Sequence, residues 1–125
     1  MSGRLTVVAP DGVPEVRPGD DLAGLLIDAL TREEVDIVTS KVVAKSEGRI
    51  GAGHRHEALA REPHRVVARR GATVIVRNEL GLTLAAGGID ASNVEPGRLV
   101  LLPLDPDASA RALRTQLQDR TGSRV

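Results

Sequence analysis

The sequence contains no phenylalanine, tyrosine, tryptophan or cysteine among its 125 residues. Without aromatic rings the chain has nothing to stack on nucleic-acid bases, which argues against a binder of single-stranded nucleic acid. The core must then be built from valine, leucine, isoleucine and alanine. The absence of cysteine excludes a disulfide framework and a thiolate zinc site.

The chain also lacks net charge and long apolar segments. Its 17 basic residues balance 17 acidic ones, so neither a nucleic-acid backbone nor an anionic membrane is favoured as a partner. The apolar runs are far shorter than the ~20 residues that a membrane span needs, and the first residues lack the apolar core of a signal peptide. We therefore expect a cytoplasmic protein with one domain.

A helix is predicted to begin after Asp20 or Asp21, either of which is a suitable N-cap. Apolar residues then recur at helical spacing and form one wide face. They are Leu22, Leu25, Leu26, Ala29 and Leu30.

The last helix has clear signals at both ends. Asp105 is a candidate N-cap, Pro106 takes the first helical position, and Gly122 stands where a left-handed C-terminal residue belongs. Its apolar stripe is formed by Ala110, Leu113 and Leu117.

Six runs have the composition of β-strands. They are residues 4–10, 35–40, 64–70, 72–79, 80–88 and 97–104. Glycine-containing turns predict hairpins between the third, fourth and fifth runs. A short helix is expected over 57–61, and residues 123–125 read as the start of a further strand. The order of elements predicts an α+β fold with a mixed, largely antiparallel sheet and helices packed on it.

The chain lacks the two common phosphate-binding patterns, GxxxxGK[ST] and GxGxxG. The stretch "TSKVVAKSEGR" is a different candidate, because the Ser40 hydroxyl and the Lys41 and Lys45 ammonium groups suit a phosphate chain. If this stretch is helical, the two lysines share a face. The alternative is an exposed basic turn, which is the commoner outcome for such a composition. His54 and His56 on a glycine-rich loop are a weaker metal candidate, since such imidazoles are more often solvated.

The stretch "GGIDASNV" places an acid and an amide after two glycines. The Asp90 carboxylate is a hard oxygen ligand of the kind that Mg²⁺ or Mn²⁺ prefers. Asn93 offers both a donor and an acceptor to a ribose or a base. An ordinary turn, in which both side chains bond their own backbone, is equally consistent with the residues.

Four segments together resemble the coenzyme F-420:L-glutamate ligases, also called F-420 γ-glutamyl ligases. In order, they are "GVPEVRPGDDLAGLL", "DIVTSKVVAKSEGRI", "AGGIDASNV" and "LLPLDPDASARALR". The resemblance implies a GTP-dependent ligase of coenzyme F-420 biosynthesis that joins L-glutamate to the carboxylate of F-420-0 and then extends the γ-glutamyl tail. It also implies bound Mg²⁺ or Mn²⁺ and a homodimer.

The resemblance assigns roles to particular residues. Asp90 is similar to the metal-ligating aspartate of the family, and Lys45 to the lysine that reaches the phosphates and acts in catalysis. The nucleotide-binding positions are expected at Val13, Pro14, Glu15, Val16, Ser40, Lys41, Lys45 and Asn93.

The family's ligase domain is longer than this sequence, and it completes its metal site with an Asp-Thr pair on a later strand. The resemblance therefore implies that residues 1–125 are the N-terminal part of the ligase domain, an incomplete portion of a larger two-lobed domain. Two alternatives remain. The chain is a catalytically inactive half that serves as a binding or assembly module, or it is an unrelated α/β domain whose motifs are turns and caps.

Overall fold

The computed structural model describes residues 3, 9–29 and 38–122. The strand predicted at 4–10, the strand predicted at 35–40 and the last three residues therefore lie wholly or largely outside the described part. Within it, Val38 and Thr39 are not in a strand and Ser40 already belongs to a helix. The strand prediction is wrong for these three residues, because the helix that carries the two lysines begins at Ser40.

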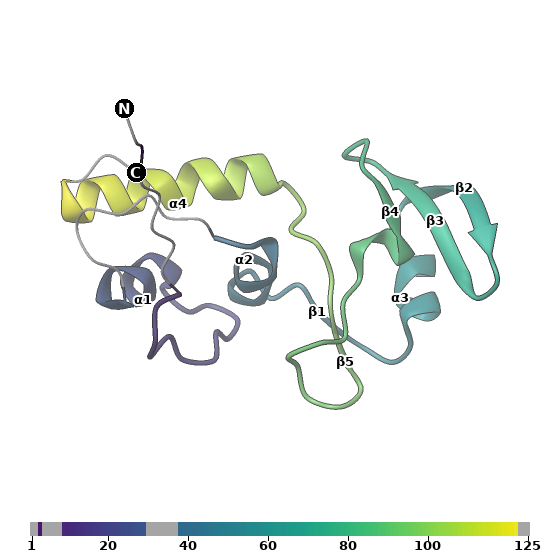
Figure 1. The fold of residues 1–125 in the computed structure, drawn as a ribbon, viewed down its shortest axis with the longest axis horizontal. Coiled ribbons are helices and arrows are strands. Elements are labelled where there is room, and N and C mark those ends of the chain that lie inside the picture. The colour runs from purple at the N-terminus through teal and green to yellow at the C-terminus, as the bar shows by residue number, and fades with distance from the viewer. Residues whose placement is uncertain (1–2, 4–8, 30–37, 123–125) are drawn as a thin grey trace.

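Three helices lie together on one side of the molecule (Figure 1). They are α1 (Leu22–Ala29), α2 (Ser40–Ser46) and α4 (Pro106–Thr121). Buried apolar side chains of α1, of α4 and of the loop before α1 form what we call the helical cluster. Its members are Val16, Leu22, Ala23, Leu26 and Leu117. Leu113 packs against this cluster but Ala110 is exposed, so the predicted stripe of α4 is narrower than expected.

The ends of α1 and α4 confirm the capping signals of the sequence. The carboxylate of Asp21 accepts a hydrogen bond from the backbone N–H of Gly24 at 3.2 Å. The carboxylate of Asp105 accepts one from Ala108 at 2.9 Å. Each bond satisfies a donor that the first helical turn leaves unpaired. Gly122 ends α4 with φ 69°, a left-handed conformation that glycine adopts without strain.

A three-stranded antiparallel sheet lies at the other end of the molecule, next to a short helix. The sheet has the order β2 (His64–Arg70), β3 (Thr73–Asn78), β4 (Thr83–Ala85), and the helix is α3 (Arg55–Arg61). The two predicted hairpins are confirmed. A second buried cluster, which we call the sheet cluster, joins this sheet to its neighbours. It comprises Ala58, Leu59, Val76, Ile89 and Leu99.

The strand predicted at 80–88 ends early, at Ala85. A short 3₁₀ turn, η1 (Ala86–Gly88), follows because all three of its residues have positive φ. A side chain on Gly87 would meet Leu59 at 2.8 Å, closer than a Cβ tolerates. The two glycines thus let the backbone turn against the sheet cluster and lead into Asp90.

Two short strands connect the two ends of the molecule. β1 (Ile50–Ala52) and β5 (Arg98–Val100) pair antiparallel, with Ile50 opposite Val100. Asp90 forms a further bridge to Val100, with backbone hydrogen bonds of 2.9 and 2.8 Å. The predicted α+β class is confirmed, and the strands divide between two small sheets in which each pairing is antiparallel. No helix of the described residues is long and apolar enough to cross a membrane.

Candidate functional site

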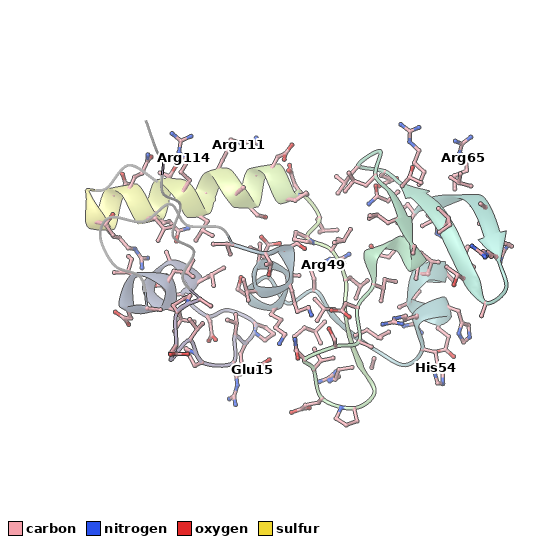
Figure 2. All side chains as sticks on the ribbon, viewed as in Figure 1. Glu15, Arg49, His54, Arg65, Arg111 and Arg114 are labelled. Atoms are coloured by element: carbon pink, nitrogen blue, oxygen red, sulfur yellow. The ribbon has the colours of Figure 1, made fainter. Side chains whose placement is uncertain are left out.

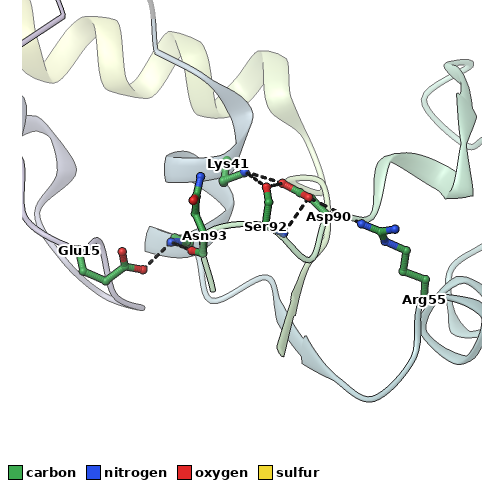
Figure 3. Close-up of polar contacts among 7 residues, drawn as sticks. Glu15, Lys41, Arg55, Asp90, Ser92 and Asn93 are labelled. Atoms are coloured by element: carbon green, nitrogen blue, oxygen red, sulfur yellow. Dashed lines mark hydrogen bonds and ion pairs between the residues drawn. The ribbon is translucent and has the colours of Figure 1, made fainter. Parts of the chain in front are cut away.

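Helix α2 places two lysines on the side that faces the 90–93 loop. Lys41 and Lys45 are four residues apart and so share a helical face, as the sequence predicts. They are also the only lysines in the chain; every other basic residue counted in its charge is an arginine. The two ammonium groups reach different partners, and these partners define two halves of the site (Figure 3).

The first half is a triangle of polar groups around Asp90. The ammonium of Lys41 lies 2.5 Å from Asp90 Oδ2 and donates a hydrogen bond to Ser92 Oγ at 2.7 Å. Ser92 in turn donates twice to the same carboxylate, from its backbone N–H to Oδ1 at 2.9 Å and from its hydroxyl to Oδ2 at 2.7 Å. Arg55, the first residue of α3, lies 3.9 Å from Oδ1.

The backbone fixes the position of this triangle. The bridge from Asp90 to Val100 holds the start of the loop beside β5, and the buried side chain of Ile89 ties it to the sheet cluster. At its other end, Asn93 has φ 54°, a left-handed conformation that asparagine tolerates better than most residues. The segment "GGIDASNV" is therefore a turn, and the turn presents the carboxylate of Asp90 to α2.

The surroundings of Asp90 favour its charged form. The hydrogen bond from the Lys41 ammonium, followed by those from the Ser92 hydroxyl and backbone, holds the pKa of the Asp90 carboxyl well below its usual range. Asp90 is thus a carboxylate at neutral pH, with its charge balanced by an ammonium group.

The second half of the site surrounds Lys45, which is buried although it is charged. Its side chain is only 5% exposed. The ammonium group forms an ion pair with Glu15 and donates to the backbone carbonyl of Asn93 at 2.7 Å. A buried ammonium needs such partners, because burial without them is costly. Lys45 thereby connects the 13–16 loop to the 90–93 loop.

An open cleft of about 1000 Å³ lies beside Lys45. Four of the predicted nucleotide-binding residues contribute to its lining, and Arg17 and Arg98 add positive charge. The four are Glu15, Val16, Lys45 and Asn93. Asp90 and Lys41 are not part of this lining, so the cleft and the Asp90 triangle meet at the adjacent residues Ser92 and Asn93.

Three of the other predicted nucleotide-binding residues are exposed and lie outside the lining of the cleft. Val13 and Pro14 are exposed in the loop before Glu15, and Ser40 is exposed in the first turn of α2. The side chain of Val16 is buried in the helical cluster, and this packing fixes the position of the loop. The rings of His54 and His56 stack on each other, with 5.7 Å between their centroids. Figure 2 shows that His54 lies apart from Glu15.

The donor set around Asp90 fits a divalent cation only in part. In the described stretches of the chain, no three histidine or acidic side chains come together as a metal-binding group. Asp90 therefore offers one carboxylate. That is sufficient for Mg²⁺ when substrate phosphates supply further oxygens, since this ion is commonly bound through one or two carboxylates and phosphates.

Sequence reasoning missed two residues beside Asp90, namely Ser92 and Arg55. Ser92 lies within the motif but carries no feature that distinguishes it from a turn serine. Arg55 comes from a different segment and meets Asp90 only through the fold. One overlooked signal was the use of lysine, because a chain that otherwise relies on arginine has both its lysines on one helix.

Comparisons with known proteins show which family this chain is similar to. The profile of the family described as F420-0:Gamma-glutamyl ligase matches residues 51–125. The coenzyme F420:L-glutamate ligase of Archaeoglobus fulgidus is 35% identical over 144 residues, covering 98% of this chain and 57% of the relative. The proteins of the same name from Methanopyrus kandleri and Haloarcula marismortui are 34% and 33% identical and cover 96% and 94% of this chain.

This chain corresponds to 58% and 56% of those two relatives, so it spans little more than half the length of the curated relatives that it matches. The match covers the sheet, the Asp90 loop and α4, and the alignments extend it over α2 as well. The chain belongs to the F420-0:gamma-glutamyl ligase family.

Proposed function

We propose that this chain supplies the nucleotide-binding and metal-binding part of a GTP-dependent ligase that joins L-glutamate to the carboxylate of F-420-0 and then extends the γ-glutamyl tail. The observation that carries the proposal is the convergence of Lys41 and Lys45 on the 90–93 loop beside an open cleft, in a chain of this family. The cytoplasm as its location and a homodimer as its assembly are part of the same proposal.

The reaction needs the carboxylate of F-420-0 to be activated before an amine can attack it. A carboxylate oxygen bonds to the γ-phosphorus of GTP while the bond to the β-γ bridging oxygen breaks, which yields an acyl phosphate and GDP. The amine of glutamate then attacks the carbonyl carbon. Inorganic phosphate leaves with the electron pair of the C–O bond, and the amine loses its proton to solvent. Such phosphoryl transfer depends mainly on positioning and on stabilising charge.

The residues of the site suit these tasks. Lys45 and Lys41 would offer two ammonium groups to phosphate oxygens, and Ser40 would offer a hydroxyl from the first turn of the same helix. Glu15 is the partner that Lys45 would exchange for a phosphate, because the Glu15 side chain is 63% exposed and water can replace the lysine. The backbone of the Val13–Val16 loop and the side chain of Asn93 would hold the rest of the nucleotide.

Asp90 would hold Mg²⁺ or Mn²⁺ together with the phosphates. When bound, the ion would neutralise charge that develops on the transferred phosphoryl group. Ser92 keeps the carboxylate oriented through two hydrogen bonds, so that Asp90 does not have to be reorganised on binding.

The second candidate function is a catalytically inactive half that serves as a binding or assembly module. It is favoured because the described residues contain no group of three or more histidine or acidic side chains that could hold a metal ion. The cleft beside Lys45 would still accept a nucleotide in such a module.

The test is a ligation assay with the 125-residue chain, F-420-0, L-glutamate, GTP and Mn²⁺, followed by mass spectrometry. It is run with and without the C-terminal part of a relative. Glutamylated product in either mixture supports the ligase, whereas nucleotide binding without product in both supports the module. Asp90→Asn should abolish product, while Asp119→Asn, the same change at an exposed position on α4, should not. Absence of both product and nucleotide binding would contradict both functions.

A further inference from the structure

The Asp90 carboxylate has an ammonium group where a metal ion would have to bind. Lys41 lies 2.5 Å from Oδ2, in direct contact with the oxygen that a cation would use. The other oxygen accepts from the backbone of Ser92 and faces Arg55 at 3.9 Å. Two positive side chains thus already surround a single negative one.

A divalent cation that approached this carboxylate alone would meet a site without net negative charge. It would also be repelled by the Lys41 ammonium at short range, where solvent screens charges least effectively. The arrangement therefore opposes the binding of a free metal ion, although the carboxylate itself is a suitable ligand.

The side chain of Lys41 can move away from Asp90, whereas the Asp90 carboxylate is held in place by Ser92. The side chain of Lys41 is 27% exposed on a flexible stem, in contrast to that of Lys45 at 5%. Asp90 keeps both of its hydrogen bonds from Ser92 when Lys41 departs, so its orientation does not depend on the lysine. The triangle can thus exchange its cation without being rebuilt.

We propose that Lys41 couples the binding of metal to the binding of nucleotide. Without nucleotide, Lys41 neutralises Asp90 and suppresses the binding of divalent cations. When the phosphates of a nucleotide enter, Lys41 pairs with them instead and leaves Asp90 available as a ligand. This inference rests on the proposed function for the nature of the nucleotide. It adds an order of events, in which metal is bound together with nucleotide and not before it.

The first experiment measures Mn²⁺ binding in the absence of nucleotide, by the loss of the electron paramagnetic resonance signal of free Mn²⁺. Lys41→Met should bind Mn²⁺ about tenfold more tightly than the wild type, because it frees Asp90. The matched control is Arg55→Gln, which removes a positive charge that also faces Asp90 but does not touch it. This control should change the affinity less than about threefold.

Three results would overturn the proposal. They are an unchanged affinity in Lys41→Met, equal effects of the two variants, and a complete lack of Mn²⁺ binding by Lys41→Met. Circular dichroism of each variant, matched to the wild type, establishes that the fold is retained.

The second experiment follows Lys41 directly by NMR of the protein labelled with ¹³Cε-lysine. The chain has only two lysines, so each signal can be assigned from its substitution by methionine. Mg²⁺ alone should leave the Lys41 signal in place, and GTP with or without Mg²⁺ should shift it. A shift with Mg²⁺ alone, or none with GTP, contradicts the coupling.

Neither experiment contains glutamate or F-420-0. Failure of ligation with these results intact would therefore count against the proposed function alone. Ligation without the predicted behaviour of Lys41 would count against this inference alone.

Discussion

The lysines of α2 and the arginines of the β2–β3 hairpin are two groups of positive charge with different surroundings. Each lysine of α2 meets a carboxylate, Lys41 at Asp90 and Lys45 at Glu15. The hairpin from His64 to Asn78 has four arginines and no acidic residue. Its Arg65 lies at the end of the molecule that carries the sheet, well apart from Glu15 (Figure 2).

The difference shows why the number of basic residues is a poor guide to a site. On the hairpin, Arg65 stands directly opposite Arg77, and neither forms an ion pair with the described residues. Their charges are solvated. At α2 the charges have fixed partners from distant parts of the chain, and this arrangement is what a ligand could exploit. The following predictions test that contrast.

The largest effect is expected at Asp90. In the ligation assay, Asp90→Ala should lower metal-dependent turnover by roughly a hundredfold or more, because the cation loses its ligand from this chain. Arg65→Gln, a charge removed from the hairpin, should leave turnover within about twofold of the wild type. Retained turnover in Asp90→Ala would refute the assignment of the metal site, and a comparable loss in Arg65→Gln would remove the distinction between the two regions.

The next effect concerns the folding of the sheet that carries the arginines. Val76 is fully buried in the sheet cluster, whereas Val67, at the bulge of the neighbouring strand, is 51% exposed. Val76→Ala should lower the free energy of unfolding by about 2 kcal/mol, since it removes buried methyl groups and leaves a cavity. Val67→Ala should change it by less than about 0.5 kcal/mol. Urea denaturation of both variants measures the difference, and equal losses would contradict the described packing.

Local patterns in the sequence predicted much of the fold. The helical period and the caps Asp21 and Asp105 located α1 and α4, and the glycine turns located both hairpins. These features depend on neighbours within a few residues. Pattern alone fails at Ser40, where a β-branched run predicts a strand although a helix begins.

The sequence predicted which residues belong to the candidate site, but it did not predict which residues contact each other there. The carboxylate of Asp90, the two lysines and Asn93 were identified from their chemistry. Their partners were not, because Lys41 and Ser92 are 51 positions apart and Lys45 and Glu15 are 30 apart. The bridge between Asp90 and Val100 holds the start of the loop that carries Ser92. A three-residue pairing of β1 with β5 is too short to be read from sequence periodicity.

A smaller effect is expected on the hairpin when its charges are paired. Arg77→Glu should place a carboxylate opposite Arg65 and raise the free energy of unfolding by about 0.5 kcal/mol, because a like-charge pair becomes an opposite-charge pair. Arg70→Glu is the matched control, since the same change there faces Thr73 and gains no such pair. Thermal or urea unfolding at low salt measures both. Equal stabilisation would indicate a general effect of net charge and not a cross-strand contact.

The smallest effect is expected at an exposed ion pair between α4 and the N-cap of α1. Arg120 lies 2.5 Å from Asp21 and joins α4 to α1. The hydrogen bond that Arg120 donates to Asp21 is the main cause of a lowered pKa at Asp21. The hydrogen bond from the Gly24 backbone is the next cause, and together they lower this pKa from its ordinary value of 3.8.

A lowered pKa in the folded state means that the unfolded chain binds more protons as the pH falls. The stabilisation by Asp21 is therefore present above pH 4 and lost as the pH drops through the folded pKa. Asp21→Asn should remove this part of the acid sensitivity, so that its urea midpoint equals that of the wild type at low pH and falls below it near pH 6. Because the pKa of Asp90 is lowered further, by an ammonium and two bonds from Ser92, Asp90→Asn should remove a larger part. Equal pH profiles for the two variants would show that the partners fixed at α2 hold charge no more firmly than a surface pair does.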